Sequence, residues 1–294
     1  LVLSLPIVVG QLGQMLMSVV DNIMVGKVGT QALAASSLAN AIFMLIMVVG
    51  FGVTMAVTPL TAIAYGRGRD EECGVVLRQG ILLNLFFGIL LCGITLVLSE
   101  CIQFLNQPLE IVDSASLYMK VLGLSMLPLM LFQSFRQFAE GVSFLKPAMI
   151  ITLLANLVNI LANWIFIYGN LGVAPLGLTG AGIATISSRT FMAITLMIII
   201  RKSSKMKRFD PTFNYRKIDF PMMRRLLAIG IPAGFQYFFE VSAFAASSIM
   251  VGWMGTVALA AHQIALNLAS ISFMVAMGIS SAATIRVSTA VGKR

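Results

Sequence analysis

The chain has 294 residues, of which 59% are hydrophobic and only 11% are charged, and its mean hydropathy is +0.95. An ordinary soluble domain carries about 25% charged residues, so this composition excludes an ordinary soluble domain. The formal net charge of +9 is explained by basic loops and does not require a nucleic-acid partner. Apolar runs such as residues 81–98 contain no charged residue and can cross about 30 Å of hydrocarbon. The sequence therefore predicts an all-α polytopic membrane protein.

Eight membrane-spanning helices are predicted from these apolar runs. They cover roughly residues 2–25, 34–64, 79–99, 116–139, 147–168, 178–200, 226–251 and 258–290. The second and eighth are longer than one crossing of the bilayer needs, so we expect them to tilt or to extend beyond it. We expect no cofactor, because no cofactor motif is present and the three cysteines lack the spacing of a metal or redox site.

The first and seventh predicted spans each contain an acidic residue, Asp21 and Glu240. A carboxylate at the centre of a membrane helix costs about 2.5–3.5 kcal/mol on insertion scales. We therefore expect each acid to face a cavity or a partner, and an acid in such a position marks a functional site by default. The alternative is a structural group whose hydrogen bonds are satisfied by a neighbouring helix.

Spans five and six add polar residues at helical spacing. Asn156, Asn159 and Asn163 follow one another at i, i+3 and i+7, so they share one face of span five. Their amide oxygens suit a hard cation around Asp21, but the same three side chains equally suit hydrogen bonds between helices. In span six, Arg189 is expected to extend towards the cytoplasmic interface or to pair with an acid on that side.

Segment 201–225 follows the sixth span and holds nine of the twenty basic residues but only two acids. Further basic residues lie in the predicted loops 65–78 and 140–146. An even number of spans separates these loops from segment 201–225, so all three lie on the same side of the membrane. Because lysine and arginine accumulate in cytoplasmic loops, these segments and the start of the chain are predicted to be cytoplasmic. A basic surface helix that binds anionic membrane lipid is the alternative interpretation of segment 201–225.

Residues 1–68 align without a gap on residues 227–294, and nineteen positions are identical. Pro6 aligns with Pro232 and Gly52 with Gly278, which favours duplication over shared apolar composition. One unit then contains 226 residues and six crossings, and an even number predicts two parallel repeats related by an axis along the membrane normal.

The predicted domains are a six-helix lobe (1–200), a basic cytoplasmic linker (201–225) and the first two helices of a second lobe (226–294). A complete duplication would have twelve spans, so we expect the chain to be part of a longer protein.

The repeat also relates the intramembrane polar residues. Asp21 aligns with Ser247, and Glu240 aligns with Gln14. The two positions in each copy are seven residues apart, so they lie on one face of the helix. Each copy therefore has a polar stripe with two positions, and each copy places its acid at a different one.

Several segments resemble the multidrug and toxic compound extrusion (MATE) family, most closely its NorM-like branch. They are DNIMVG, RQFAEGVSFLKPAM, NLVNILANWIFIYG, GLTGAGIAT, IPAGFQYFFE and AAHQIALN, in this order along nearly the whole chain. The resemblance implies a V-shaped antiporter with two six-helix lobes that expels small cationic, lipophilic compounds in exchange for Na⁺ or H⁺. It further implies a monomer in the bacterial inner membrane, with lipid around it and no cofactor.

Carried over by position, Asp21 matches the first-helix acid of the family, a cation or proton site. Asn159 and Asn163 match the polar pair that completes this site, and Thr185 matches a further ligand. Some relatives have an aspartate where this chain has Asn163, and this departure favours Na⁺ as the coupling ion.

The resemblance also assigns residues outside this site. Glu240 matches the seventh-helix acid of the NorM-like branch, a second coupling residue. Gln263 matches a polar residue of the C-terminal cavity, and we place Gln14 and Asn156 in the substrate cavity with it.

Two other functions were compared with an antiporter. A flippase of the same fold, which moves a lipid-linked oligosaccharide or peptidoglycan precursor, would line its cavity with basic residues. The basic residues that we place within the spans are Arg189 and Arg286, near the cytoplasmic ends, which is unfavourable for a flippase. An intramembrane enzyme is not expected, because the chain contains neither G-x-S-x-G nor H-E-x-x-H.

Overall fold

The computed structural model describes residues 3–105, 108–209, 218–252 and 256–294, and within these ranges all regular structure is helical. The helices are α1 (Ser4–Gly26), α2 (Thr30–Met55), α3 (Val57–Gly66), α4 (Asp70–Cys101), the 3₁₀ helix η1 (Ile102–Leu105), α5 (Leu109–Leu124), α6 (Met126–Gly141), α7 (Leu145–Phe166), α8 (Gly177–Lys202), α9 (Ser204–Lys207), α10 (Phe220–Gly252) and α11 (Thr256–Gly292). Eight segments of the described chain are long and apolar enough to span a membrane, so the predicted number of spans is confirmed.

Two of the eight spans each consist of two consecutive α-helices. The second span consists of α2 and α3, and the fourth consists of α5 and α6. Pro59 and Pro128 explain both breaks, because a proline ring clashes with the carbonyl four residues earlier. Those earlier residues are Met55 and Leu124, the last residues of α2 and α5. Each proline therefore bends its span where the preceding helix ends.

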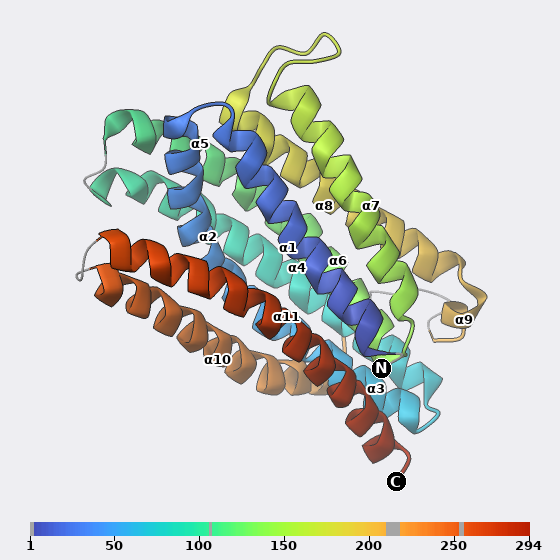
Figure 1. The fold of residues 1–294 in the computed structure, drawn as a ribbon. Coiled ribbons are helices and arrows are strands. Elements are labelled where there is room, and N and C mark those ends of the chain that lie inside the picture. The colour runs from blue at the N-terminus through green and yellow to red at the C-terminus, as the bar shows by residue number, and fades with distance from the viewer. Residues whose placement is uncertain (1–2, 106–107, 210–217, 253–255) are drawn as a thin grey trace.

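Helices α1 to α8 form a bundle, and α10 and α11 run side by side along one flank of it (Figure 1). Helix α10 packs on α2, while α11 packs on both α1 and α3. In the sequence repeat α10 corresponds to α1, and α11 corresponds to α2 and α3. The contact of α10 with α2 is thus the repeat counterpart of the contact of α1 with α11.

Glycines bring these paired helices into backbone contact. A Cβ atom added to Gly52 on α2 would overlap the backbone of Gly234 on α10. A Cβ atom on Gly278 of α11 would come within 3.2 Å of the backbone N and Cα of Val8 on α1. Gly278 and Val8 correspond to Gly52 and Gly234 through the 226-residue offset. The two close approaches are therefore equivalent under the repeat, as a two-fold relation between its copies requires.

A third close approach lies where α3 meets α11. A Cβ atom on Gly66 would overlap the carbonyl oxygen of Thr289, and one on Gly292 would overlap that of Ile63. Gly66 and Gly292, like Ile63 and Thr289, are equivalent positions of the repeat. Exchanging the two copies of the repeat therefore gives the same contact again, so this contact lies on the axis that relates the two copies.

The bundle interior is apolar, whereas many large apolar side chains point outwards. Phe132, Phe135 and Phe138 of α6 are fully buried against α3, α4 and α8. By contrast Phe86 and Val97 of α4 are exposed. Apolar residues on the outside of a helical bundle are expected when the surrounding solvent is lipid.

Candidate functional site

Asp21 lies on α1 where this helix faces α7. Its Oδ1 accepts a 2.6 Å hydrogen bond from Nδ2 of Asn163, and the same amide donates at 3.1 Å to Oδ1 of Asn159. Both asparagines are completely buried. The structure therefore brings Asn159 and Asn163 of this α7 face together with Asp21.

Two buried polar atoms of this group have no hydrogen-bond partner among the described residues. They are Oδ1 of Asn163 and Nδ2 of Asn159. A buried polar atom without a partner is destabilising unless a water, an ion or a ligand satisfies it. The carboxylate and the amide oxygens together offer the hard oxygen donors that suit Na⁺. The described part of the chain contains no cluster of three or more His, Cys, Asp or Glu residues that could hold a metal ion.

The two remaining residues predicted near Asp21 lie in different places. Thr185 of α8 is close enough to interact with Asp21, although its hydroxyl donates a 3.0 Å bond to the carbonyl of Ala181. Asn156 does not reach Asp21. Its amide donates at 2.9 Å to the carbonyl oxygens of Gly13 and Thr152 and so connects α7 to α1.

Arg189 is placed differently from the prediction. Its Nη1 donates a 2.5 Å hydrogen bond to Ser125 Oγ, and its guanidinium carbon lies 5.4 Å from the centre of the Phe43 ring. The side chain therefore points into the bundle, at the break between α5 and α6. The expectation that it extends to the cytoplasmic interface or pairs with an acid there is wrong, because a hydroxyl and an aromatic ring within the bundle hold it.

A cavity of about 220 Å³ lies between α1, α2, α3 and α6 on one side and α10 and α11 on the other; we call it the central cavity. Most of its lining comes from repeat-equivalent pairs: Gln11 and Tyr237, Phe51 and Met277, Thr54 and Ser280, Met55 and Ser281, and Thr58 and Thr284. The central cavity is therefore centred on the axis of the repeat, and most of the residues that line it carry a hydroxyl or amide group. Gln14, which we predicted in the substrate cavity, lines the central cavity, whereas Asn156 is not part of its lining.

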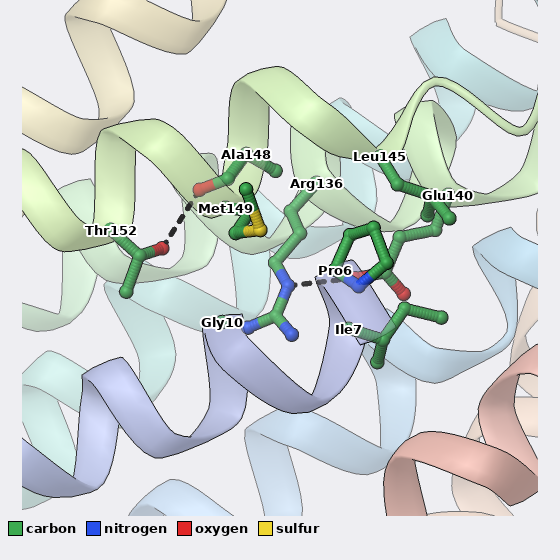
Figure 2. A pocket seen from close by; sticks show the side chains of 9 residues that line it. All are labelled: Pro6, Ile7, Gly10, Arg136, Glu140, Leu145, Ala148, Met149 and Thr152. Carbon is green, nitrogen blue, oxygen red and sulfur yellow. Dashed lines mark hydrogen bonds and ion pairs between the residues drawn. The ribbon is translucent and has the colours of Figure 1, made fainter. Parts of the chain in front are cut away.

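Helix α6 contributes an ion pair to the central cavity that the sequence analysis missed. Nε of Arg136 lies 2.8 Å from Oε1 of Glu140, and each residue is only 5% exposed. Figure 2 shows the guanidinium above Gly10 of α1, with the Glu140 side chain beside Pro6 and Ile7. We expected acids within the spans only at Asp21 and Glu240, and basic residues only at Arg189 and Arg286. That expectation is wrong. Arg136 already lay within the predicted span 116–139, and Glu140 joins it because α6 continues to Gly141. The i, i+4 spacing lets the two charges neutralise each other.

Neighbouring polar groups surround this ion pair. Thr58 of α3 donates to the side chain and to the main-chain carbonyl of Gln137, the latter at 3.0 Å. Oε1 of Gln133 is buried without a partner among the described residues. The i, i+4 spacing in RQFAE was the signal available in the sequence, but it was hidden by the placement of residues 140–146 in a loop.

Glu240 lies on α10, away from Asp21. The side chain is half-buried one turn beyond Tyr237, which lines the central cavity. Tyr237 is the residue with which Glu240 interacts electrostatically. The side chain of Gln263 lies outside the described part of the structure, so its assignment to the cavity stays a prediction.

Many transporter folds are built from internal repeats and place polar sites between them within the membrane. Comparison with known proteins agrees. The chain is 32% identical to the multidrug resistance protein NorM of Vibrio parahaemolyticus over 291 residues, 99% of this chain and 64% of that relative. It is 36% identical to the multidrug resistance protein MdtK of Yersinia pestis in an alignment of 299 positions, which covers all of this chain and 64% of that relative. This chain thus spans about 64% of the length of these relatives.

A similar solved structure is the outward-facing conformation of a multidrug resistance MATE family transporter. It superposes with a TM-score of 0.88 over 99% of this chain and 64% of that one, at 22% identity. The family model described as MatE matches residues 6–165 and 232–294. The chain therefore belongs to the MATE (MatE) family, as its motifs predicted.

Proposed function

We propose that the protein is a secondary antiporter that exports cationic, lipophilic drugs or metabolites in exchange for Na⁺ or H⁺. The observation that supports this most directly is the Asp21 carboxylate, hydrogen-bonded to Asn163 in the interior of the bundle. An acid in such a position is costly in a membrane and is retained where it binds a cation or a proton. Asp21, Asn159, Asn163 and Thr185 form the proposed coupling site.

Na⁺ is the coupling ion that this group of residues suits better. The Asn163 amide holds the carboxylate through its N–H group and leaves its oxygen without a partner. Rotation of this amide would bring a second hard oxygen beside Asp21, and Asn159 offers a third. Proton coupling needs only Asp21, so it gives no role to the two buried amide oxygens.

The exported compound would bind in the central cavity, which Gln14 lines and which Glu240 and Gln263 are proposed to extend. The relatives named multidrug resistance proteins support drug-like substrates, and Glu240 provides a negative charge for cationic ones. Coupling requires that cation and substrate bind the inward-facing and outward-facing states with different affinities.

The test uses full-length protein in proteoliposomes with an imposed Na⁺ or H⁺ gradient. Ethidium movement is followed for wild type, Asp21→Asn, Glu240→Gln and the control Glu71→Gln, whose carboxylate is exposed at the start of α4. We expect the Na⁺ gradient to drive transport, Asp21→Asn to abolish it and Glu71→Gln to leave it unchanged. Equal transport by wild type and Asp21→Asn would contradict the proposed coupling site.

A lipid-linked oligosaccharide or peptidoglycan-precursor flippase remains the second candidate, because Arg136 lines the central cavity. The pairing of Arg136 with Glu140 leaves no net positive charge there for a pyrophosphate. If folded wild type moves no cationic dye under either gradient, the flippase becomes the better proposal.

We further propose a monomer in the bacterial inner membrane, with the N-terminus and segment 201–225 in the cytoplasm. The basic residues on that side support this orientation. Impermeant thiol labelling in intact cells tests it, with Lys205→Cys and Lys120→Cys in a Cys101→Ser background. We expect labelling only at position 120, and labelling only at 205 would reverse the orientation.

A further inference from the structure

Arg189 carries a positive charge that no acidic side chain neutralises directly. Its Nη1 donates a 2.5 Å hydrogen bond to the Ser125 hydroxyl, and its guanidinium carbon makes a cation–π contact with the Phe43 ring, 5.4 Å from the ring centre. Among the described residues, no carboxylate lies within ion-pairing distance of the guanidinium. A partly buried guanidinium without a paired acid is costly, so a more distant negative charge would stabilise it.

The packing of α1 against α8 identifies that negative charge. Ser188 Oγ lies 3.9 Å from Met17 Sδ, and Thr185 interacts with Asp21. Asp21 is one turn beyond Met17 on α1, and Thr185 is one turn before Arg189 on α8. The two helices are thus antiparallel here. Along the helix axis, the backbone of Arg189 lies about one helical turn, roughly 5.4 Å, from the backbone of Asp21. At such a separation in the bundle interior, opposite unit charges attract each other appreciably.

We propose that Arg189 sets the Na⁺ affinity of the Asp21 site. Its positive charge compensates the ionised carboxylate when the site is empty, and it repels a cation that binds there. Arg189 is not a ligand in this scheme but acts through the field at Asp21. The inference rests on the proposed function of Asp21 as a cation site and adds the residue that regulates it.

The expected size of the effect follows from Coulomb's law. The axes of packed helices lie about 8–10 Å apart, so we take about 8 Å as the separation of the two charges. At the effective dielectric constant of about 20 that suits partly buried groups, two unit charges at this separation change a binding constant roughly 30-fold. Screening reduces this value, so we expect removal of the Arg189 charge to tighten Na⁺ binding about 10- to 30-fold.

The position of Ser125 connects this charge to the shape of the bundle. Ser125 is the single residue between α5 and α6, where Pro128 bends the span. A change in the angle between these helices moves the Ser125 hydroxyl and, with it, the guanidinium relative to Asp21. A change in helix packing would then be enough to release the cation, and none of the residues that bind it would have to move away first.

The experiment measures Na⁺ binding by isothermal titration calorimetry to the purified full-length protein in detergent, with K⁺ keeping the ionic strength constant. The variants are Asp21→Asn, Arg189→Gln and Arg189→Lys. The matched control is Lys202→Gln, which removes the same charge from the exposed end of the same helix. We expect Arg189→Gln to bind Na⁺ about 10- to 30-fold more tightly, while Arg189→Lys and Lys202→Gln stay near wild type.

The outcomes separate the inference from the proposed function. If wild type shows no Na⁺ binding that Asp21→Asn removes, the proposed cation site is wrong and the inference falls with it. If such binding exists but Arg189→Gln leaves it unchanged or weakens it, only the inference is overturned. Should Arg189→Gln fail to fold, Arg189→Met replaces it. Failure of both neutral variants, with Arg189→Lys folded, would show that the charge is structural and would also overturn the inference.

Discussion

The ion pair between Arg136 and Glu140 leads to a quantitative prediction about stability. Glu140→Gln or Arg136→Gln leaves one charge, 5% exposed, without its partner at 2.8 Å. The surrounding wall from α1 and α7 includes Pro6, Ile7 and Leu145, which cannot solvate it. Breaking a buried pair from one side costs about 3–5 kcal/mol. Because the pair also borders the polar central cavity, we expect the lower end, about 3 kcal/mol.

Replacing both residues tests whether the loss comes from the stranded charge. The double variant Arg136→Met with Glu140→Leu removes both charges and keeps most of the side-chain volume. Exchange of a buried pair for apolar residues is often neutral or stabilising. We therefore expect the double variant to lie within about 1 kcal/mol of wild type, with a coupling energy of several kcal/mol in the double-mutant cycle.

The assay is thermal unfolding in detergent, followed with a thiol-reactive dye. Cys73 and Cys92 are buried, while Cys101 is exposed, so a Cys101→Ser background confines the signal to thiols that unfolding uncovers. A loss of about 3 kcal/mol lowers Tm by roughly 6–12 °C, and Glu71→Gln serves as the control. Single variants within 2 °C of wild type, or a double variant as unstable as the singles, would refute this reasoning about the ion pair.

Three further predictions concern neighbouring features. Gly66→Ala is expected to destabilise the protein, because the added Cβ atom would overlap the carbonyl oxygen of Thr289. In the control Gly93→Ala the Cβ atom meets no atom within 4 Å, so this variant should be neutral or more stable by up to about 1 kcal/mol. Equal Tm values for the two variants would contradict the close contact of α3 with α11. Asn156→Ala should lower stability by about 1 kcal/mol through its lost hydrogen bonds but keep Na⁺ binding, whereas Asn163→Ala should lose Na⁺ binding. Titration calorimetry with Na⁺ distinguishes the two variants. Loss of Na⁺ binding in Asn156→Ala but not in Asn163→Ala would contradict this assignment. Thr58→Val should lower Tm by a few degrees, since it leaves Gln137 without its donor on α3, and an unchanged Tm would show that water replaces that donor.

Hydropathy alone predicted the eight spans, because the thickness of the bilayer imposes the same minimum length on every crossing helix. It did not predict the breaks after Met55 and Leu124. Both sites were visible in principle, since Pro59 and Pro128 each stand four residues later, but an apolar run looks the same whether it is bent or straight.

The candidate site was predicted in part for a related reason. Helical spacing showed that Asn156, Asn159 and Asn163 share a face. It could not show that Asn156 bonds to the main chain of α1 while the other two face Asp21, because the level at which two helices meet is set by their packing.

The sequence by itself determined the class of protein, the number of spans, the internal repeat and the acid at position 21, because composition and periodicity depend only on the order of residues. Only the tertiary structure decided the partners of the charges: Glu140 for Arg136, and Ser125 with Phe43 for Arg189. The central cavity was likewise decided by packing, because it lies where glycines let two distant copies of the repeat approach each other. A contact between residues 226 positions apart is an outcome of folding, and local sequence patterns carry no information about its geometry.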